Sequence, residues 1–181
     1  MRIQDVRPAA ASSTFALLLA ACLASPAASA NTGLISFNGE ITDATCDVRG
    51  GATGSPSFFV DLPTISANQL GPNEIAGQTQ FRMTLENCSA VANGVKAYFQ
   101  SGGTVDAASG TLVTNLPGVH LALFDHDGTR IAVGQESQRT NGAVYQVGDT
   151  MYYHVAYENL GATNASPGLV ASSVVYSLHY P

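Results

Sequence analysis

The side chains that could carry chemistry are few and widely spaced. The four histidines fall in different predicted strands and one predicted turn: His120, His126, His154 and His179. The densest group of possible metal ligands is Asp125-His126-Asp127, which Gly128 follows. Asp-x-Asp-Gly is ordinary turn chemistry, and successive side chains at a hairpin tip diverge. We therefore expect no metal site and no cofactor.

Motif and charge patterns argue against catalysis and against nucleic acid. The sequence has no Gly-x-Ser-x-Gly elbow, no phosphate-binding glycine loop and no His-Glu-x-x-His. Charged residues make up 11% of the chain, the net charge is -6, and Lys96 is the only lysine. A basic surface for nucleic acid or an anionic membrane is therefore not expected. The sequence predicts a protein that is not an enzyme and has no nucleic-acid partner.

Residues 1–30 have the pattern of a secretory signal peptide. Arg2 and Arg7 give a basic start, and Ala9 to Ala24 is apolar but short for a membrane span. Ala28-Ser29-Ala30 then supplies the small-x-small pattern at which signal peptidase cuts. We expect export, with residues 31–181 as the folded part.

Cys22 allows a second interpretation of the same region. Leu19-Ala20-Ala21-Cys22 resembles the lipobox of bacterial lipoproteins, in which the cysteine is acylated. The alternative function is then a lipid-anchored or secreted β-sandwich that acts as a binding module. A chain that begins at Asn31 and a chain acylated at Cys22 would be distinguished by N-terminal sequencing.

Two cysteines remain beyond the signal, Cys46 and Cys88. An even count in an exported protein predicts a disulfide. The bond would close a loop of about 42 residues and stabilise the fold by about 4 kcal/mol. Metal binding would need more ligands at shorter spacing.

The hydrophobic pattern is that of one all-β domain. Phe81, Met83 and Leu85 alternate with polar residues before Cys88, and similar short runs recur between clusters of Gly, Pro, Asn and Asp. This pattern is typical of a β-sandwich. Asp125 to Gly128 predicts a hairpin turn between two such runs.

The two ends of the exported part are complementary. A long final run places six residues on one face: Val170, Ser172, Val174, Tyr176, Leu178 and Tyr180. No residues remain to form a strand beside it, and a bare apolar edge strand favours aggregation. At the other end, Ile35, Phe37, Gly39 and Ile41 alternate with polar residues in a strand without a partner. Strand addition between copies would satisfy both ends and build an open-ended fibre.

These features together resemble the type 1-like pilins of the chaperone–usher pathway, over nearly the whole exported part. Gly39 lies seven positions before Cys46, Gly168 is fourteenth from the C-terminus, and Tyr180 is penultimate. Thr42 to Cys46 is similar to the residues that lead up to the first cysteine in this family. Tyr153 to Tyr157 resembles an aromatic strand that precedes the family's terminal motif. Leu62 to Ser66 and Asn93 to Phe99 resemble the serotype fimbrial subunits of Bordetella in particular.

The resemblance implies an incomplete immunoglobulin-like β-sandwich that lacks its last strand. Residues 1–30 would be the signal, 31–43 the donor strand and 44–181 the sandwich. The expected function is that of a structural subunit of an adhesive fimbria, exported through the periplasm to the cell surface. Its expected partners are other pilin copies, a periplasmic chaperone and an outer-membrane usher. The family motif assigns the groove and the chaperone-read positions to five residues: Gly168, Val174, Tyr176, Leu178 and Tyr180.

Overall fold

The computed structural model describes residues 45–89 and 91–181. The predicted signal (1–30), Cys22 and the predicted donor strand with Ile35, Phe37, Gly39 and Ile41 lie outside the described residues. Those assignments, with their boundaries, therefore stay predictions.

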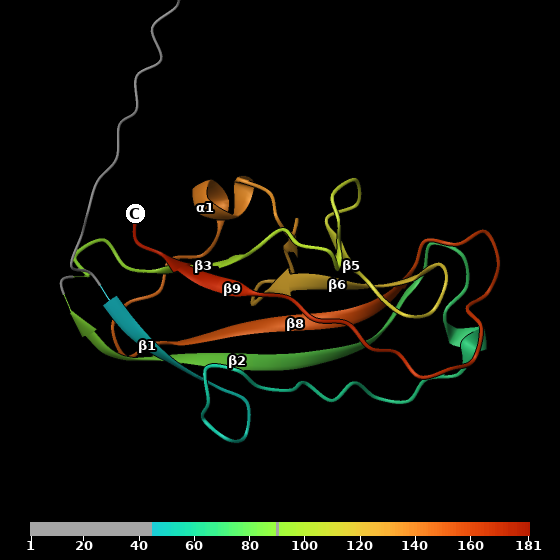
Figure 1. The fold of residues 1–181 in the computed structure, drawn as a ribbon, viewed down its shortest axis with the longest axis horizontal. Coiled ribbons are helices and arrows are strands. Elements are labelled where there is room, and N and C mark those ends of the chain that lie inside the picture. The colour runs from blue at the N-terminus through green and yellow to red at the C-terminus, as the bar shows by residue number, and fades with distance from the viewer. Residues whose placement is uncertain (1–44, 90) are drawn as a thin grey trace, which may run out of the picture. The chain divides into compact units, whose positions relative to one another are not determined.

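One layer of the fold is an antiparallel sheet of seven strands. Its strands follow the order β1-β2-β8-β6-β5-β4, with β7 paired to β6 (Figure 1). Their bounds are Thr45–Gly50 (β1), Ile75–Ser89 (β2), Val105–Asp106 (β4), Thr111–Val113 (β5), Val119–Asp125 (β6), Arg130–Ile131 (β7) and Thr150–Asn159 (β8).

The second layer contains two antiparallel strands, β3 (Lys96–Phe99) and β9 (Tyr176–His179). A short helix, α1 (Ser137–Asn141), contacts β3, and a single 3₁₀ turn covers Ala67–Gln69. In Figure 1, β3 and β9 lie across the seven-stranded sheet. This arrangement confirms the predicted all-β sandwich.

Residue alternation explains the two longest strands. In β2, Met83 and Leu85 are buried between the more exposed Arg82, Thr84 and Glu86. In β8, Met151, Tyr153 and Val155 are buried on the same side of the sheet. Because successive strand residues point to opposite faces, one face of each strand is apolar and the other is polar.

The core lies between the two layers. Phe99 of β3 packs edge-on against Tyr153 of β8, with 5.3 Å between the ring centroids. Met83, Met151 and Val95 have no exposed surface. Burying these side chains provides the main apolar stabilisation of the sandwich.

The predicted turn at Asp125 to Gly128 is confirmed as the hairpin between β6 and β7. The Asp125 amide donates to the carbonyl of Thr129 over 2.8 Å, and Gly128 has a φ of 84°. Glycine adopts this left-handed conformation without steric cost.

Three details differ from expectation. The sequence pattern predicts that Cys88 belongs to the strand after Phe81, Met83 and Leu85, but β2 runs on to Ser89 and contains all four residues. The final run is a paired strand only over β9. Helix α1 was not expected, because its five residues show no apolar periodicity.

Candidate functional site

The last segment of the chain lines one side of a groove. Along residues 170–176, burial alternates, so that Val170, Val174 and Tyr176 are partly buried against the core. Leu178 and Tyr180 continue this face. The opposite face points outward, as Val175 shows with 65% of its surface exposed. The structure thus brings together four predicted groove residues (Val174, Tyr176, Leu178 and Tyr180) on one face.

The extended stretch Phe58–Leu62 contributes a second set of apolar side chains. Phe58, Val60 and Leu62 are partly buried against the core, whereas Phe59 is 96% exposed. The Phe58 ring lies over Gly50, where a Cβ would come within 2.1 Å of Cε1. Among the described residues, no backbone amide or carbonyl of Phe58–Leu62 has a hydrogen-bond partner. Within residues 45–89 and 91–181, the stretch therefore pairs with no strand.

Two hollows lie along these segments. One has a volume of about 620 Å³, and Cys46, Val48, Tyr176, Leu178 and Tyr180 are among the residues that line it. The other has a volume of about 520 Å³ and is lined by residues that include Val60, Leu62, Ile65, Leu116 and Val170. We call the space along Phe58–Leu62 and residues 170–180 the apolar groove. Its walls are side chains that are only half buried.

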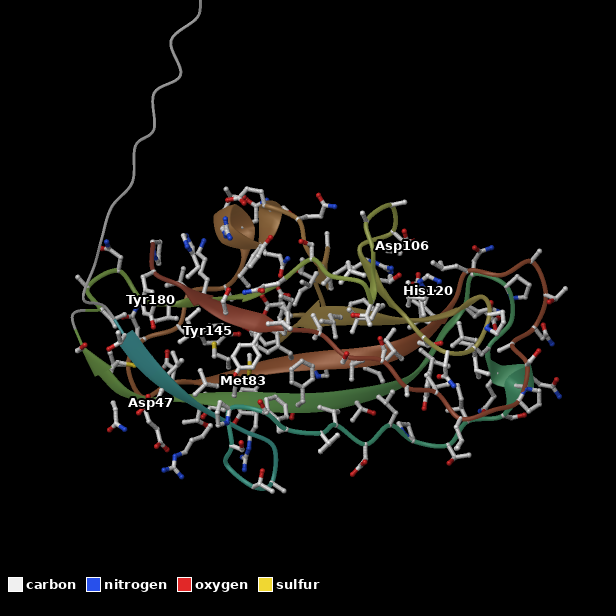
Figure 2. The ribbon with its side chains drawn as sticks, viewed as in Figure 1. Asp47, Met83, Asp106, His120, Tyr145 and Tyr180 are labelled. Atoms are coloured by element: carbon white, nitrogen blue, oxygen red, sulfur yellow. A yellow bond between two sulfur atoms is a disulfide. The ribbon has the colours of Figure 1, made fainter. Side chains whose placement is uncertain are left out.

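The hydroxyls of Tyr176 in β9 and of Tyr180, just after β9, reach to the β1 side of the apolar groove. Tyr176 donates to the carbonyl of Pro56 over 2.7 Å. The Cys46 amide donates to the Tyr180 hydroxyl over 2.8 Å. Tyr180, labelled in Figure 2, therefore holds the end of the chain against the first strand of the described domain.

Gly168 lies at the other end of the apolar groove. A Cβ at this position would approach Cδ2 of Leu116 to 2.7 Å. Glycine therefore permits Leu116 to pack closely under the start of the final segment. This close approach gives Gly168 a structural role beside the recognition role that the family motif predicts.

The predicted disulfide is present. Cys46 of β1 and Cys88 of β2 are bonded, with 4.0 Å between their Cα atoms. The bond lies beside the Tyr180 hydroxyl, since the Cys46 amide donates to that oxygen. It joins neighbouring strands of one sheet at the end of the apolar groove.

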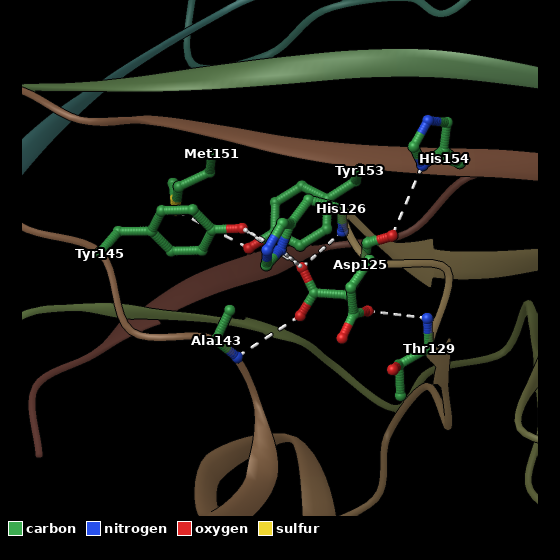
Figure 3. Close-up of polar contacts among 9 residues, drawn as sticks. Asp125, His126, Thr129, Ala143, Tyr145, Met151, Tyr153 and His154 are labelled. Carbon is green, nitrogen blue, oxygen red and sulfur yellow. Dashed lines mark hydrogen bonds and ion pairs between the residues drawn. The ribbon is translucent and has the colours of Figure 1, made fainter.

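The Asp125-His126-Asp127 turn forms a polar cluster (Figure 3). The Tyr145 hydroxyl and the His126 side chain contact Asp125 Oδ1 at 3.2 Å and 2.9 Å. The hydrogen bond that Asp125 accepts from His126 raises the pKa of His126. Burial, and to a lesser extent the Asp125 charge, raise the pKa of Tyr145. Asp127 instead accepts a hydrogen bond from the Thr129 amide. Within residues 45–89 and 91–181, no group of three or more potential ligands could hold a metal ion.

The histidines do not meet in a catalytic arrangement among the described residues. His154 Nδ1 lies 3.4 Å from the Asp125 carbonyl, and His120 Nδ1 lies 2.7 Å from the Thr111 hydroxyl. Thr111 is fully buried, so this hydroxyl is closed to a substrate. In the sequence, Phe58 to Leu62 is a short apolar run that Pro63 ends. The alternation of Phe58, Val60 and Leu62 was the available signal for a groove wall.

In the described part of the chain, no helix has the length and apolar character to cross a membrane.

Comparisons with known proteins agree on one family. A family model described as "Fimbrial protein" matches residues 35–180. The major fimbrial subunit SMF-1 of Stenotrophomonas maltophilia is 36% identical over 168 residues, which cover 85% of this chain and 95% of that protein. The serotype 2 fimbrial subunit of Bordetella pertussis is 43% identical over 100 residues, covering 53% of this chain and 48% of that protein.

Solved structures support the fold. The P pilus rod subunit PapA matches with a TM-score of 0.58 at 20% identity, over 82% of this chain and 100% of that chain. The chain belongs to the fimbrial protein family and is a structural subunit of a cell-surface fimbria. The family indicates a structural role rather than catalysis.

Proposed function

We propose that the apolar groove receives a strand from a neighbouring pilin copy, and that this exchange polymerises the fimbria. The observation that supports the proposal is the unpaired backbone of Phe58–Leu62 beside the half-buried face of residues 170–180. An extended segment without a partner strand is a site at which a strand can be added. An inserted strand would bury the half-exposed apolar face and pair the free backbone groups.

The proposed donor is the segment 31–43 of another copy. Ile35, Phe37, Gly39 and Ile41 alternate at the spacing of one strand face. A strand of this length spans about 40 Å, and residues 170–180 span about 35 Å at about 3.3 Å per residue. The donor is therefore long enough to cover the apolar groove, and Gly39 would fit where the groove is shallow.

Chain connectivity favours one direction for the donor. Asp43 and Thr45 are close in sequence, so the body of a donating copy would lie at the C-terminal end of its donated strand. In the receiving copy, the end of the sandwich that carries the disulfide must stay free, because that copy's own donor strand leaves from there. The incoming strand would therefore enter near Ile65 and Val170 and run antiparallel to β9.

Before assembly, a periplasmic chaperone would cover the apolar groove beside Val174 to Tyr180. Gly168 and Tyr180 would be read by that chaperone, and an outer-membrane usher would bring in the next subunit. These partners follow from the family and from the need to protect an apolar edge during export.

The proposal is tested by adding residues 31–43 after Pro181 through a short flexible linker. An antiparallel donor would begin near the C-terminus, so a hairpin-length linker of about four residues is sufficient. The fused chain should be a soluble monomer by size-exclusion chromatography with light scattering. The matched control carries Phe37→Asp in the added copy and should aggregate, because a charge would be buried in the groove. Identical behaviour of the two fusions would refute the proposal.

A further inference from the structure

The two-stranded sheet of β3 and β9 has a second edge, along β3, and this edge is occupied. The amide of Phe99 donates to Oε1 of Gln138 over 2.9 Å, and Nε2 of Gln138 donates to the Phe99 carbonyl over 3.0 Å. In an antiparallel sheet, two paired residues can exchange one hydrogen bond in each direction. The Gln138 side chain makes the same two kinds of bond with the backbone of Phe99. The Gly134 amide also donates to the Phe99 carbonyl, over 3.0 Å, so Gln138 alone bonds the Phe99 amide and shares the Phe99 carbonyl with Gly134.

Neighbouring contacts extend this closure along β3. Val95 and Tyr145 exchange two backbone hydrogen bonds of 2.8 Å. Between Val95 and Phe99, Ala97 lines a small hollow of about 160 Å³ that Gln138 also lines. Val95, just before β3, and Phe99, at its end, are therefore both bonded on this side, and Ala97 between them is buried.

A buried lysine fixes the helix in this position. Lys96 is 8% exposed, and its Nζ donates to the carbonyls of Arg139 and Thr140 over 2.8 Å and 3.0 Å. Arg139 in turn lies over the ring of Tyr98, 4.1 Å from its centroid. Gln138 itself is 6% exposed. A buried amide is costly unless its hydrogen bonds are made, so its placement against Phe99 is specific.

We propose that Gln138 selects the edge at which a strand can add. Its amide blocks the β3 edge, so that an incoming extended strand of another copy can pair only at the β9 edge. The β9 edge differs, because among the described residues no side-chain amide bonds the backbone of Tyr176 to Tyr180, and the hydroxyls of Tyr176 and Tyr180 bond the backbone of Pro56 and Cys46 instead. Such a block keeps the fimbria unbranched, because a subunit with two open strand edges would accept a strand from two other copies. The inference rests on the proposed function for the identity of the incoming strand.

The test counts strands bound per subunit. Exported subunits are mixed with a synthetic peptide of residues 31–43, and native mass spectrometry records the stoichiometry. The wild type should bind at most one peptide, whereas Gln138→Ala and the apolar, size-matched Gln138→Met should bind a second. Gln135→Ala is the matched control, because Gln135 is exposed and its side chain bonds only the Ala107 carbonyl at 3.2 Å.

Hydrogen exchange gives a second readout at the edge itself. The Phe99 amide should exchange about tenfold faster in both Gln138 variants, as expected for the loss of a neutral hydrogen bond. One peptide per subunit in both folded variants would overturn the proposal. Loss of the fold in both variants would also count against it, because Gln138 would then be a structural residue.

A groove variant separates this result from the proposed function. Val174→Arg places a charge in the apolar groove and should abolish the first peptide but not the one gained through Gln138→Ala. Absence of any peptide on the wild type would refute the groove. The edge block would still be judged by whether the Gln138 variants gain a peptide that the wild type lacks.

Discussion

The hydroxyl of Tyr180 gives the sharpest test of the apolar groove. Tyr180→Phe removes only the oxygen that accepts the 2.8 Å hydrogen bond from Cys46. Because that amide is part-buried, the loss should cost about 1 kcal/mol of unfolding free energy. Tyr180→Ala also removes a half-buried ring, which raises the total cost to about 2 kcal/mol.

Urea unfolding of the purified fusion that carries residues 31–43 after Pro181 measures both effects. With a slope of about 2 kcal/mol/M, the midpoints should fall by about 0.5 M for Tyr180→Phe and about 1 M for Tyr180→Ala. The control is Tyr152→Phe, because Tyr152 lies on the outer face of β8 and its hydroxyl has no hydrogen-bond partner among the described residues. An unchanged midpoint for Tyr180→Phe, or an equal fall for Tyr152→Phe, would refute the reasoning.

The same variants separate stability from chaperone recognition in cells. Tyr180→Phe keeps the ring and should still give fibres, although fewer. Tyr180→Ala should abolish the fibres. A chaperone that recognises this side chain would no longer hold the variant subunit, which proteases would then degrade. Normal piliation by Tyr180→Ala would contradict the recognition role and leave the measured unfolding free energies standing.

Two further predictions concern the disulfide and the polar turn. Replacing Cys46 and Cys88 together by serine should lower the unfolding free energy by about 4 kcal/mol, or about 2 M urea, and a loss below about 1 kcal/mol would contradict the chain-entropy argument. His126→Ala should remove a stabilisation that is fully present below pH 6.5, since the folded-state pKa of His126 is raised above its ordinary value of 6.5. That stabilisation is lost as the pH rises through the folded-state pKa, so the urea midpoints of variant and wild type should converge as the pH is raised above that pKa. A gap that stays constant with pH would argue against it.

Local sequence patterns were sufficient to predict the strands that pair with a neighbouring strand. Alternation alone places Met83 and Leu85 on one face of a strand, and the residue types of Asp125 to Gly128 predict a turn. In both cases the information lies within a few residues of sequence. The disulfide needed only the cysteine count and the export signal.

Features that depend on distant contacts were not predictable in this way. Alternation over residues 170–175 indicated which side chains are buried, but it carries no information on whether a strand lies alongside. Helix α1 is too short to be stable alone, and it forms where Lys96 binds its last carbonyls. Phe58–Leu62 reads as a strand by composition, and only the fold shows that its backbone has no partner among the described residues.

The position of the disulfide also determines how tension would travel through the subunit. A pull on the chain before Thr45 meets the covalent bond one residue later, at Cys46. Without that bond, β1 could peel from β2 one pair of hydrogen bonds at a time. With it, the force passes directly into the fifteen residues of β2, which is paired with β8. Under strain, the hydrogen-bonded contacts between subunits should therefore separate before this end of the sandwich unravels.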